Sequence, residues 1–172
     1  MQNFIEKYEE KLKENVYLKK REKYFRKLVR DNELCLSINW LTDLNKIDLS
    51  QLKTDISLDN FPDDYKIIWS NTDTICEKMF KNSNKAFPKD KLWVKRSRDP
   101  QTIVRLLDFI ENGNNLIPPI FTIPNDTLLV IDGNHRFALF RFLKIIEIPF
   151  IIKKTEIKQL VKIELKYWEN KI

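Results

Sequence analysis

Apolar residues recur with helical spacing in the first thirty residues of the chain. Residues 4–30 contain no glycine or proline, and their apolar positions lie three or four residues apart, which predicts helix. The apolar stripe is interrupted across residues 15–23, so two helices and one bent helix both fit. The charged face of this segment is typical of a solvated surface. It also fits an oligomer or partner contact through the N-terminal helix.

The pattern is less regular in the middle of the chain. Residues 34–40 fit a short strand, and residues 43–53 fit either a helix or a loop. A strand is predicted over residues 65–69. A helix is expected to follow it, with Thr72 or Asp73 as its N-cap.

The second half of the chain has sharper signals. Residues 92–97 fit a strand, and Asp99 followed by Pro100 predicts the N-cap and first residue of a helix. Gly113 stands where that helix needs a left-handed residue at its C-terminal end. Further along, the pattern predicts strands within 116–123, 128–131 and 145–152, and helices over 134–144 and from Thr155 to the C-terminus.

Strands and helices that alternate in this way are typical of α/β or α+β proteins. We predict the α+β class (mixed α/β), with a small mixed sheet flanked by helices. The polar connection over residues 81–91 indicates a boundary. Residues 1–88 would then form a mainly helical extension, and residues 89–172 the domain that contains the sheet.

Composition narrows the class of protein. The chain has 172 residues, of which 42% are hydrophobic and 33% charged, as in a folded globular protein. No apolar run approaches the roughly 18 residues of a membrane span, and the polar start argues against a signal peptide. We therefore expect a cytoplasmic protein without membrane contact. Cys35 and Cys76 are expected to be reduced apolar fillers.

Charge is spread unevenly along the chain. Residues 1–30 contain ten Lys/Arg and five Glu, a balance of +5, whereas residues 31–64 contain two Lys and eight acids, a balance of −6. The total of +6 leaves +7 for the remaining residues. This basic excess suits an anionic ligand, although a value of this size does not by itself indicate nucleic-acid binding.

The chain's single histidine lies in the segment Asp-Gly-Asn-His-Arg, residues 132–136. A predicted buried strand runs into a helix here with no loop between them, so Gly133 is expected to adopt a positive φ. With Asn134 as the N-cap, His135 and Arg136 fall in the first helical turn. Unpaired backbone N–H groups and the positive end of the helix dipole make such a turn an anion site.

Each side chain of this turn suits a phosphate group. Arg136 offers a planar fork of donors, and His135 can donate a hydrogen bond or move a proton near neutral pH. Asp132 has three possible roles: orienting Arg136, binding a metal on a polyphosphate, or acting as a base. The alternative is a structural corner, in which backbone carbonyls and Asp132 satisfy His135 and Arg136.

The run "LIPPIFTI…LLVIDGNHRFALFRFLKIIEIPFII" resembles the ParB/sulfiredoxin superfamily. The similarity covers about residues 90–155, with Gly113 and Pro119 in the expected places. In that superfamily a Gly-x-x-Arg turn grips nucleotide phosphates, which implies a nucleotide-binding site at Gly133, Asn134, His135 and Arg136. It also implies ATP or CTP with Mg²⁺ as the ligand, the metal reaching Asp132 through the phosphates.

Branches of this superfamily differ in their chemistry. Sulfiredoxins carry a reactive cysteine where this chain has Asn134, and chromosome-partitioning ParB proteins add a helix-turn-helix that we do not find here. The Asp-Gly-x-His-Arg form is most similar to free-serine kinases and to ParB-like nuclease domains. That resemblance implies Asp132 and His135 as catalytic residues of a nucleotide hydrolase, a kinase-like phosphotransferase or a nuclease.

A second basic group lies just before the helix that begins at Pro100. Lys95, Arg96 and Arg98 fit a rim that contacts a phosphate tail or a nucleic-acid backbone, and they also fit a solvated basic edge. Arg141 lies about 140° around the helix from Arg136, so it is expected to form a structural pair instead of sharing a ligand.

Three functions fit these observations. The first is a nucleotide-binding domain that hydrolyses the nucleotide, transfers a phosphoryl group or is switched by the nucleotide. The second is a DNA-binding protein that tracks phosphates with helix 1–30 and residues 95–98. The third is a non-catalytic interaction module whose pocket is filled by the protein's own side chains.

Overall fold

Helices and a mixed β-sheet both contribute to the fold, so the protein belongs to the α+β class, as predicted. The structure is a computed structural model that describes residues 2–52, 58–81, 83–93 and 99–169. Residue contacts divide the chain into two compact units. Unit 1 comprises Met1–Asn39 and Arg98–Asn114, and unit 2 comprises Trp40–Ser97 and Asn115–Ile172.

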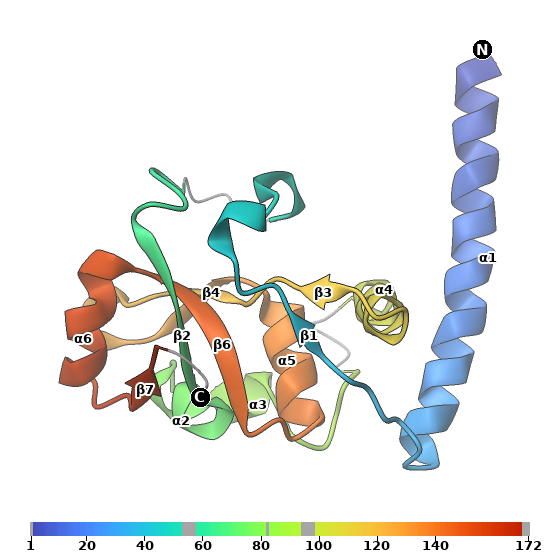
Figure 1. Cartoon of the computed structure of the whole chain (residues 1–172). Helices are drawn as coiled ribbons and strands as arrows, with labels where there is room; N and C mark the ends of the chain where they lie inside the picture. Colours follow the sequence, from blue (N-terminus) through green and yellow to red (C-terminus); the bar gives the residue numbers. More distant parts are fainter. Residues whose placement is uncertain (1, 53–57, 82, 94–98, 170–172) are drawn as a thin grey trace. The chain divides into compact units, whose positions relative to one another are not determined.

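Unit 1 consists of two helices, α1 (Gln2–Arg30) and α4 (Pro100–Glu111). α1 is one continuous helix (Figure 1), so of the two arrangements expected for this segment the two-helix one is wrong. It ends where Asn32 adopts a left-handed φ of 56°. Asparagine can replace glycine at this position, because its short polar side chain tolerates the left-handed conformation.

α1 and α4 pack against each other through a set of polar and apolar contacts. The Tyr17 hydroxyl donates to the Asp108 carboxylate at 2.9 Å, and the Arg21 guanidinium forms ion pairs with Asp108 and Glu111. Buried apolar side chains complete the unit, namely Leu18 and Phe25 of α1 and Ile103, Val104, Leu107 and Ile110 of α4.

Unit 2 is built on a five-stranded sheet with the order β5-β4-β6-β2-β7. β4 and β6 are parallel, and the other neighbouring pairs are antiparallel. The strands are β2 (Tyr65–Asn71), β4 (Ile120–Thr122), β5 (Leu129–Asp132), β6 (Glu147–Lys153) and β7 (Tyr167–Trp168). β2 therefore pairs with strands from the second half of the chain, so this division differs from the boundary predicted after residue 88.

Side chains alternate between the two faces of the sheet along each strand. Other elements of unit 2 pack against both faces. Ile120 and Ile151 belong to a cluster that packs against apolar side chains earlier in the chain, namely Leu41, Leu44, Leu52, Leu58 and Phe61. Their neighbours in sequence, Phe121 and Phe150, contact each other with ring centroids 5.1 Å apart. Phe121 also contacts Phe137 of α5 (Asn134–Phe142), so this helix packs on that face of the sheet.

The remaining elements are short. β1 (Asn39–Trp40) and β3 (Asn115–Leu116) form a separate two-stranded sheet, and 3₁₀ turns cover Leu44–Lys46, Leu49–Gln51, Pro124–Asp126 and Lys154–Glu156. The helices α2 (Thr72–Lys78), α3 (Ser83–Ala86) and α6 (Ile157–Lys162) complete unit 2. Within the described residues, each helix is too short or too polar to cross a lipid bilayer.

Three sequence-based expectations need correction. Asn71, and not Thr72 or Asp73, is the N-cap of α2: its side chain accepts from the amides of Asp73 and Thr74. The last helix does not run from Thr155 to the C-terminus; it begins at Ile157 and ends at Lys162, because β7 pairs with the edge of β2. In the described part of the chain neither cysteine forms a disulfide, but only Cys76 fills the core, since Cys35 is exposed.

Candidate functional site

The candidate site is the junction between β5 and α5. β5 ends at Asp132 and α5 begins at Asn134, so Gly133 alone connects them. Its φ is 92°, and a Cβ atom at this position would lie 2.9 Å from both Cα and Cβ of Pro119. The turn thus requires glycine for its conformation and for the close approach of Pro119. The predicted positive φ is confirmed.

The N-cap of the helix lies one residue earlier than predicted. Gly133, and not Asn134, is the N-cap, because its carbonyl oxygen accepts the first helical hydrogen bond, from the amide of Phe137 at 2.8 Å. Asn134 is already helical and exposed to solvent. No N-cap side chain therefore accepts a hydrogen bond from the first amides of α5.

Arg136 is directed towards the protein. Its guanidinium donates to the carbonyl oxygen of Ile117 at 2.5 Å and forms an ion pair with the Asp132 carboxylate, and only 15% of its side chain is exposed. Burial lowers the pKa of Arg136 and the charge of Asp132 opposes that shift, but an arginine still carries its proton at neutral pH. Of the three roles considered for Asp132, orienting Arg136 is the one its contacts show.

The predicted site residues differ in their surroundings. Arg136 has the partners that the structural-corner alternative requires, a backbone carbonyl and Asp132. His135 is partly exposed in the first helical turn, next to the exposed Asn134. The predicted phosphate rim of Lys95, Arg96 and Arg98 lies outside the described residues.

The rest of α5 is fixed firmly in unit 2. Phe137 contacts Phe87 with ring centroids 5.0 Å apart, and Phe140 contacts Trp40 at 4.8 Å. Arg141 is buried; it donates to the Phe87 carbonyl at 3.2 Å and forms an ion pair with Asp73. As predicted, Arg141 therefore forms structural contacts away from Arg136. A helix held in this way gives its first turn a defined position.

Sequence reasoning missed two partners of the turn, Ile117 and Pro119. Ile117 contributes only its backbone carbonyl oxygen. Every residue type has this acceptor, so the sequence gives no signal for the contact. Pro119 was noted as part of a strand and of the family resemblance but not as a partner of the turn, although a proline facing a required glycine fits a close approach of two backbones. Among the described residues, no group of three or more His, Cys, Asp or Glu side chains is arranged to hold a metal ion.

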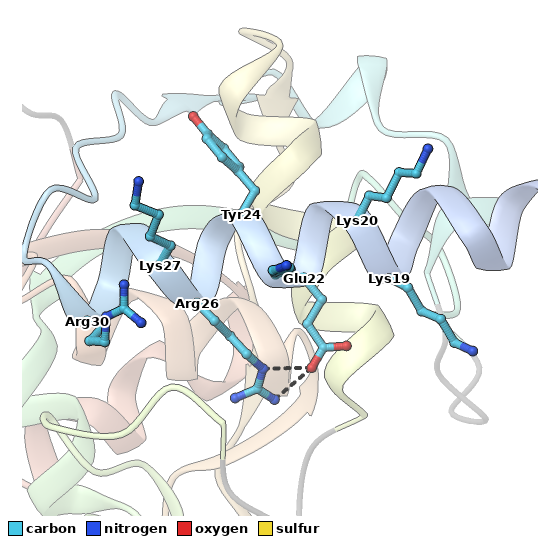
Figure 2. A pocket seen from close by; sticks show the side chains of 8 residues that line it. Lys19, Lys20, Glu22, Tyr24, Arg26, Lys27 and Arg30 are labelled. Carbon is cyan, nitrogen blue, oxygen red and sulfur yellow. Dashed lines mark hydrogen bonds and ion pairs between the residues drawn. The ribbon is translucent and has the colours of Figure 1, made fainter.

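A second polar feature lies on α1 of unit 1. A hollow of about 740 Å³ runs along the C-terminal half of this helix. Figure 2 shows that Arg26 holds the single carboxylate among its lining side chains, that of Glu22. The lining consists of six basic residues with one acid and one tyrosine: Lys19, Lys20, Lys23, Arg26, Lys27, Arg30, Glu22 and Tyr24. This surface is suited to an anion.

Comparisons with known proteins give no further guide to these two features. No family model matches the chain, and no significant match was found among curated proteins or among solved structures.

Proposed function

We propose that the start of α5 binds the phosphate tail of a nucleoside triphosphate, ATP or CTP carrying Mg²⁺. The observation that supports this proposal is the missing cap. Gly133 has no side chain to accept hydrogen bonds from the first amides of α5, in a helix of nine residues whose body is anchored in the core. Uncapped amides and the positive end of a helix dipole favour an anion.

In this proposal the side chains of the turn have separate roles. The amides at the start of the helix and the His135 side chain contact the phosphate oxygens. Arg136 holds the turn in shape through Asp132 and Ile117, and its charge adds to the positive potential there. Mg²⁺ is held mainly by the phosphates, because the Asp132 carboxylate is engaged by Arg136. The resemblance of the Gly-x-x-Arg turn to the ParB/sulfiredoxin superfamily supports the same assignment.

Any phosphoryl transfer or hydrolysis at this site would rely on His135. Histidine is the residue type suited to moving a proton near neutral pH, and His135 lies in the first helical turn. Asp132 is a poor candidate for a base, since protonating it would break its ion pair with Arg136. Binding is therefore the primary function proposed, and catalysis is secondary to it.

Calorimetric titration with ATP, CTP, GTP and UTP, each with and without Mg²⁺, tests the proposal. We expect binding in the millimolar range or tighter. Asn134→Asp should weaken it about tenfold, because the new carboxylate would compete for the same amides. The same substitution should raise the stability of the fold by about 0.5 kcal/mol through the helix dipole.

Gln101→Glu is the matched control, since it adds one negative charge to the first turn of α4. It should leave nucleotide binding unchanged. If no nucleotide gives heat, or if Asn134→Asp binds as tightly as the original chain, the amides of α5 do not hold a phosphate and the proposal fails.

The basic hollow on α1 supports a second candidate function, binding of a nucleic-acid backbone. Six basic side chains face one hollow there, and the one carboxylate among them is held by Arg26. Binding of this kind weakens steeply with salt, with a slope of about −0.9 in log K for each phosphate neutralised.

Fluorescence anisotropy with a labelled duplex, measured over a range of salt concentrations, tests this second function. Lys19→Gln combined with Lys23→Gln should reduce the salt slope by about two. Lys7→Gln combined with Lys11→Gln removes the same charge from outside the hollow and should leave the slope unchanged. A slope that responds equally to both pairs would show that only the net charge matters.

A further inference from the structure

Among the residues that the structure describes, the N-terminal half of α1 has one face without a partner, although Glu14 and Tyr17 on its other side contact Arg105 and Asp108 of α4. All residues from 5 to 17 are exposed, including five large hydrophobic side chains, of which all except Tyr17 lie on one face. Ile5 is 57% exposed, Tyr8 59%, Leu12 48% and Val16 54%. A helical segment as short as residues 5–17 is marginal in water unless packing supports it. This half of α1 therefore has the properties of a segment that is completed by a partner.

The four apolar side chains form one stripe. At about 100° per residue they fall within an arc of about 80°. They lie on the far side of the helix from Leu18, Arg21 and Phe25, which belong to the packed face of unit 1. A hollow of about 400 Å³ beside Leu12 and Val16 has a mostly apolar lining. The stripe can thus be covered without disturbing the contacts between α1 and α4.

We propose that this stripe binds the same stripe of a second copy of the chain, with the two α1 helices antiparallel. In this arrangement Ile5 packs against the partner subunit's Val16, and Tyr8 packs against the partner subunit's Leu12. Twofold symmetry produces each contact twice, so one surface is sufficient for both subunits. This inference does not depend on the nucleotide proposal.

Charge along α1 favours a second copy and fixes its direction. The face that carries the apolar stripe continues towards the C-terminal end of the helix with Lys19, Lys23 and Arg30. Parallel pairing would place these like charges side by side, which is unfavourable. Antiparallel pairing over residues 5–16 leaves the two basic segments at opposite ends. In that register Glu9 also lies beside the partner subunit's Lys13, on the same flank of the stripe.

The interface is small, with four large apolar side chains from each copy. Contacts of this size belong to the weak, transient class. We therefore expect a dissociation constant in the micromolar range or weaker, with a helix content that rises with protein concentration.

Sedimentation equilibrium from about 1 μM to 1 mM tests the proposal on the intact chain. The mean mass should rise from monomer towards dimer, and Leu12→Asp should weaken association at least tenfold by placing a charge in the apolar contact. Ile146→Asp is the matched control, because Ile146 is 70% exposed but lies outside α1. It should associate like the original chain.

A charge-reversal series tests the antiparallel register. Glu9→Lys and Lys13→Glu should each weaken the dimer, because each places like charges together across the interface. The double variant should restore it, since opposite charges then face each other again in exchanged positions. A monomer at every concentration overturns the proposal, even if the chain then binds lipid vesicles. Dimers that Leu12→Asp leaves intact, or a double variant without restored association, overturn it as well.

Discussion

The helices α4 and α5 begin in opposite ways. α4 begins at Asp99, whose carboxylate accepts from the amides of Gln101 and Thr102, both at 3.2 Å, and from the Thr102 hydroxyl at 2.8 Å. The hydrogen bonds from Thr102 and the two amides lower the pKa of Asp99, since they favour the charged carboxylate. α5 begins at Gly133, which has no side chain to take that role.

The difference shows that an acid near the start of a helix is not always a cap. Asp99 stands at the N-cap position, so its carboxylate turns back onto the helix amides. Asp132 stands one residue before the N-cap of α5, and its carboxylate pairs with Arg136 instead. At α4 the chain supplies its own anion for the helix end. At α5 that anion can come from outside, which is why we propose a phosphate ligand there.

The largest expected effect comes from removing the acid of the α5 junction. Asp132→Ala should lower the free energy of unfolding by about 3–4 kcal/mol, because it leaves the Arg136 charge buried without its partner. Urea unfolding measures this loss. Asp126→Ala is the control: it removes an ion pair with Lys162 in which both side chains are exposed, and it should cost almost nothing. Equal losses would mean that the Asp132–Arg136 pair does not hold the turn.

A smaller loss in the free energy of unfolding is expected from adding a methyl group to Gly133, which connects β5 and α5. Gly133→Ala should cost about 2–3 kcal/mol, from the positive φ together with the contact at 2.9 Å with Pro119. Gly113→Ala at the end of α4 also has a positive φ, but nothing lies within 4 Å of the new Cβ. It should cost only about 1 kcal/mol. Thermal unfolding of the two variants separates the cost of the contact with Pro119 from the cost of the backbone strain.

The smallest expected change in stability comes from the residues at the N-termini of α4 and α5. Asp99→Ala should cost about 1 kcal/mol at pH 7. Because the pKa of Asp99 in the folded protein lies below the unfolded value of about 3.9, its stabilisation is complete above that pH and is lost as the pH falls through the folded pKa. Unfolding curves at pH 7 and near pH 3 should therefore differ in the cost of the substitution.

The matching change in α5 is Asn134→Ala, which should not destabilise the protein because Asn134 is an exposed residue inside the helix. Alanine also has the higher helix propensity. A loss of about 1 kcal/mol would instead mean that Asn134 caps α5 in solution.

Local chemistry made part of the fold predictable. The Asp99-Pro100 start of α4, the left-handed Gly113 at its end and the positive φ of Gly133 all follow from what one residue type can do. Helix over residues 4–30 was predictable for the same reason, since nothing within the segment breaks a helix, although its pattern did not decide between one helix and two. These features depend on residues that lie close together in the sequence.

Features that depend on distant residues were not predictable. The last helix is shorter than its pattern indicates, because residues 167–168 pair with β2 nearly one hundred positions earlier. The sequence left two alternatives for Arg136, a ligand site and a structural corner. Nothing in the sequence directs its side chain to the Ile117 carbonyl. Likewise, the apolar pattern is weak around Leu41, Leu44, Leu52, Leu58 and Phe61, although these side chains pack against one face of the sheet. In each case tertiary contacts decide the outcome.

The position of β2 beside β6 also affects how the chain folds during synthesis. β2 is made roughly 80 residues before β6, and the two strands pair along their whole length. Until β6 leaves the ribosome, β2 has no neighbour on that edge. Such long-range pairing slows folding. The sheet of unit 2 therefore forms only after β6 and β7 have been translated.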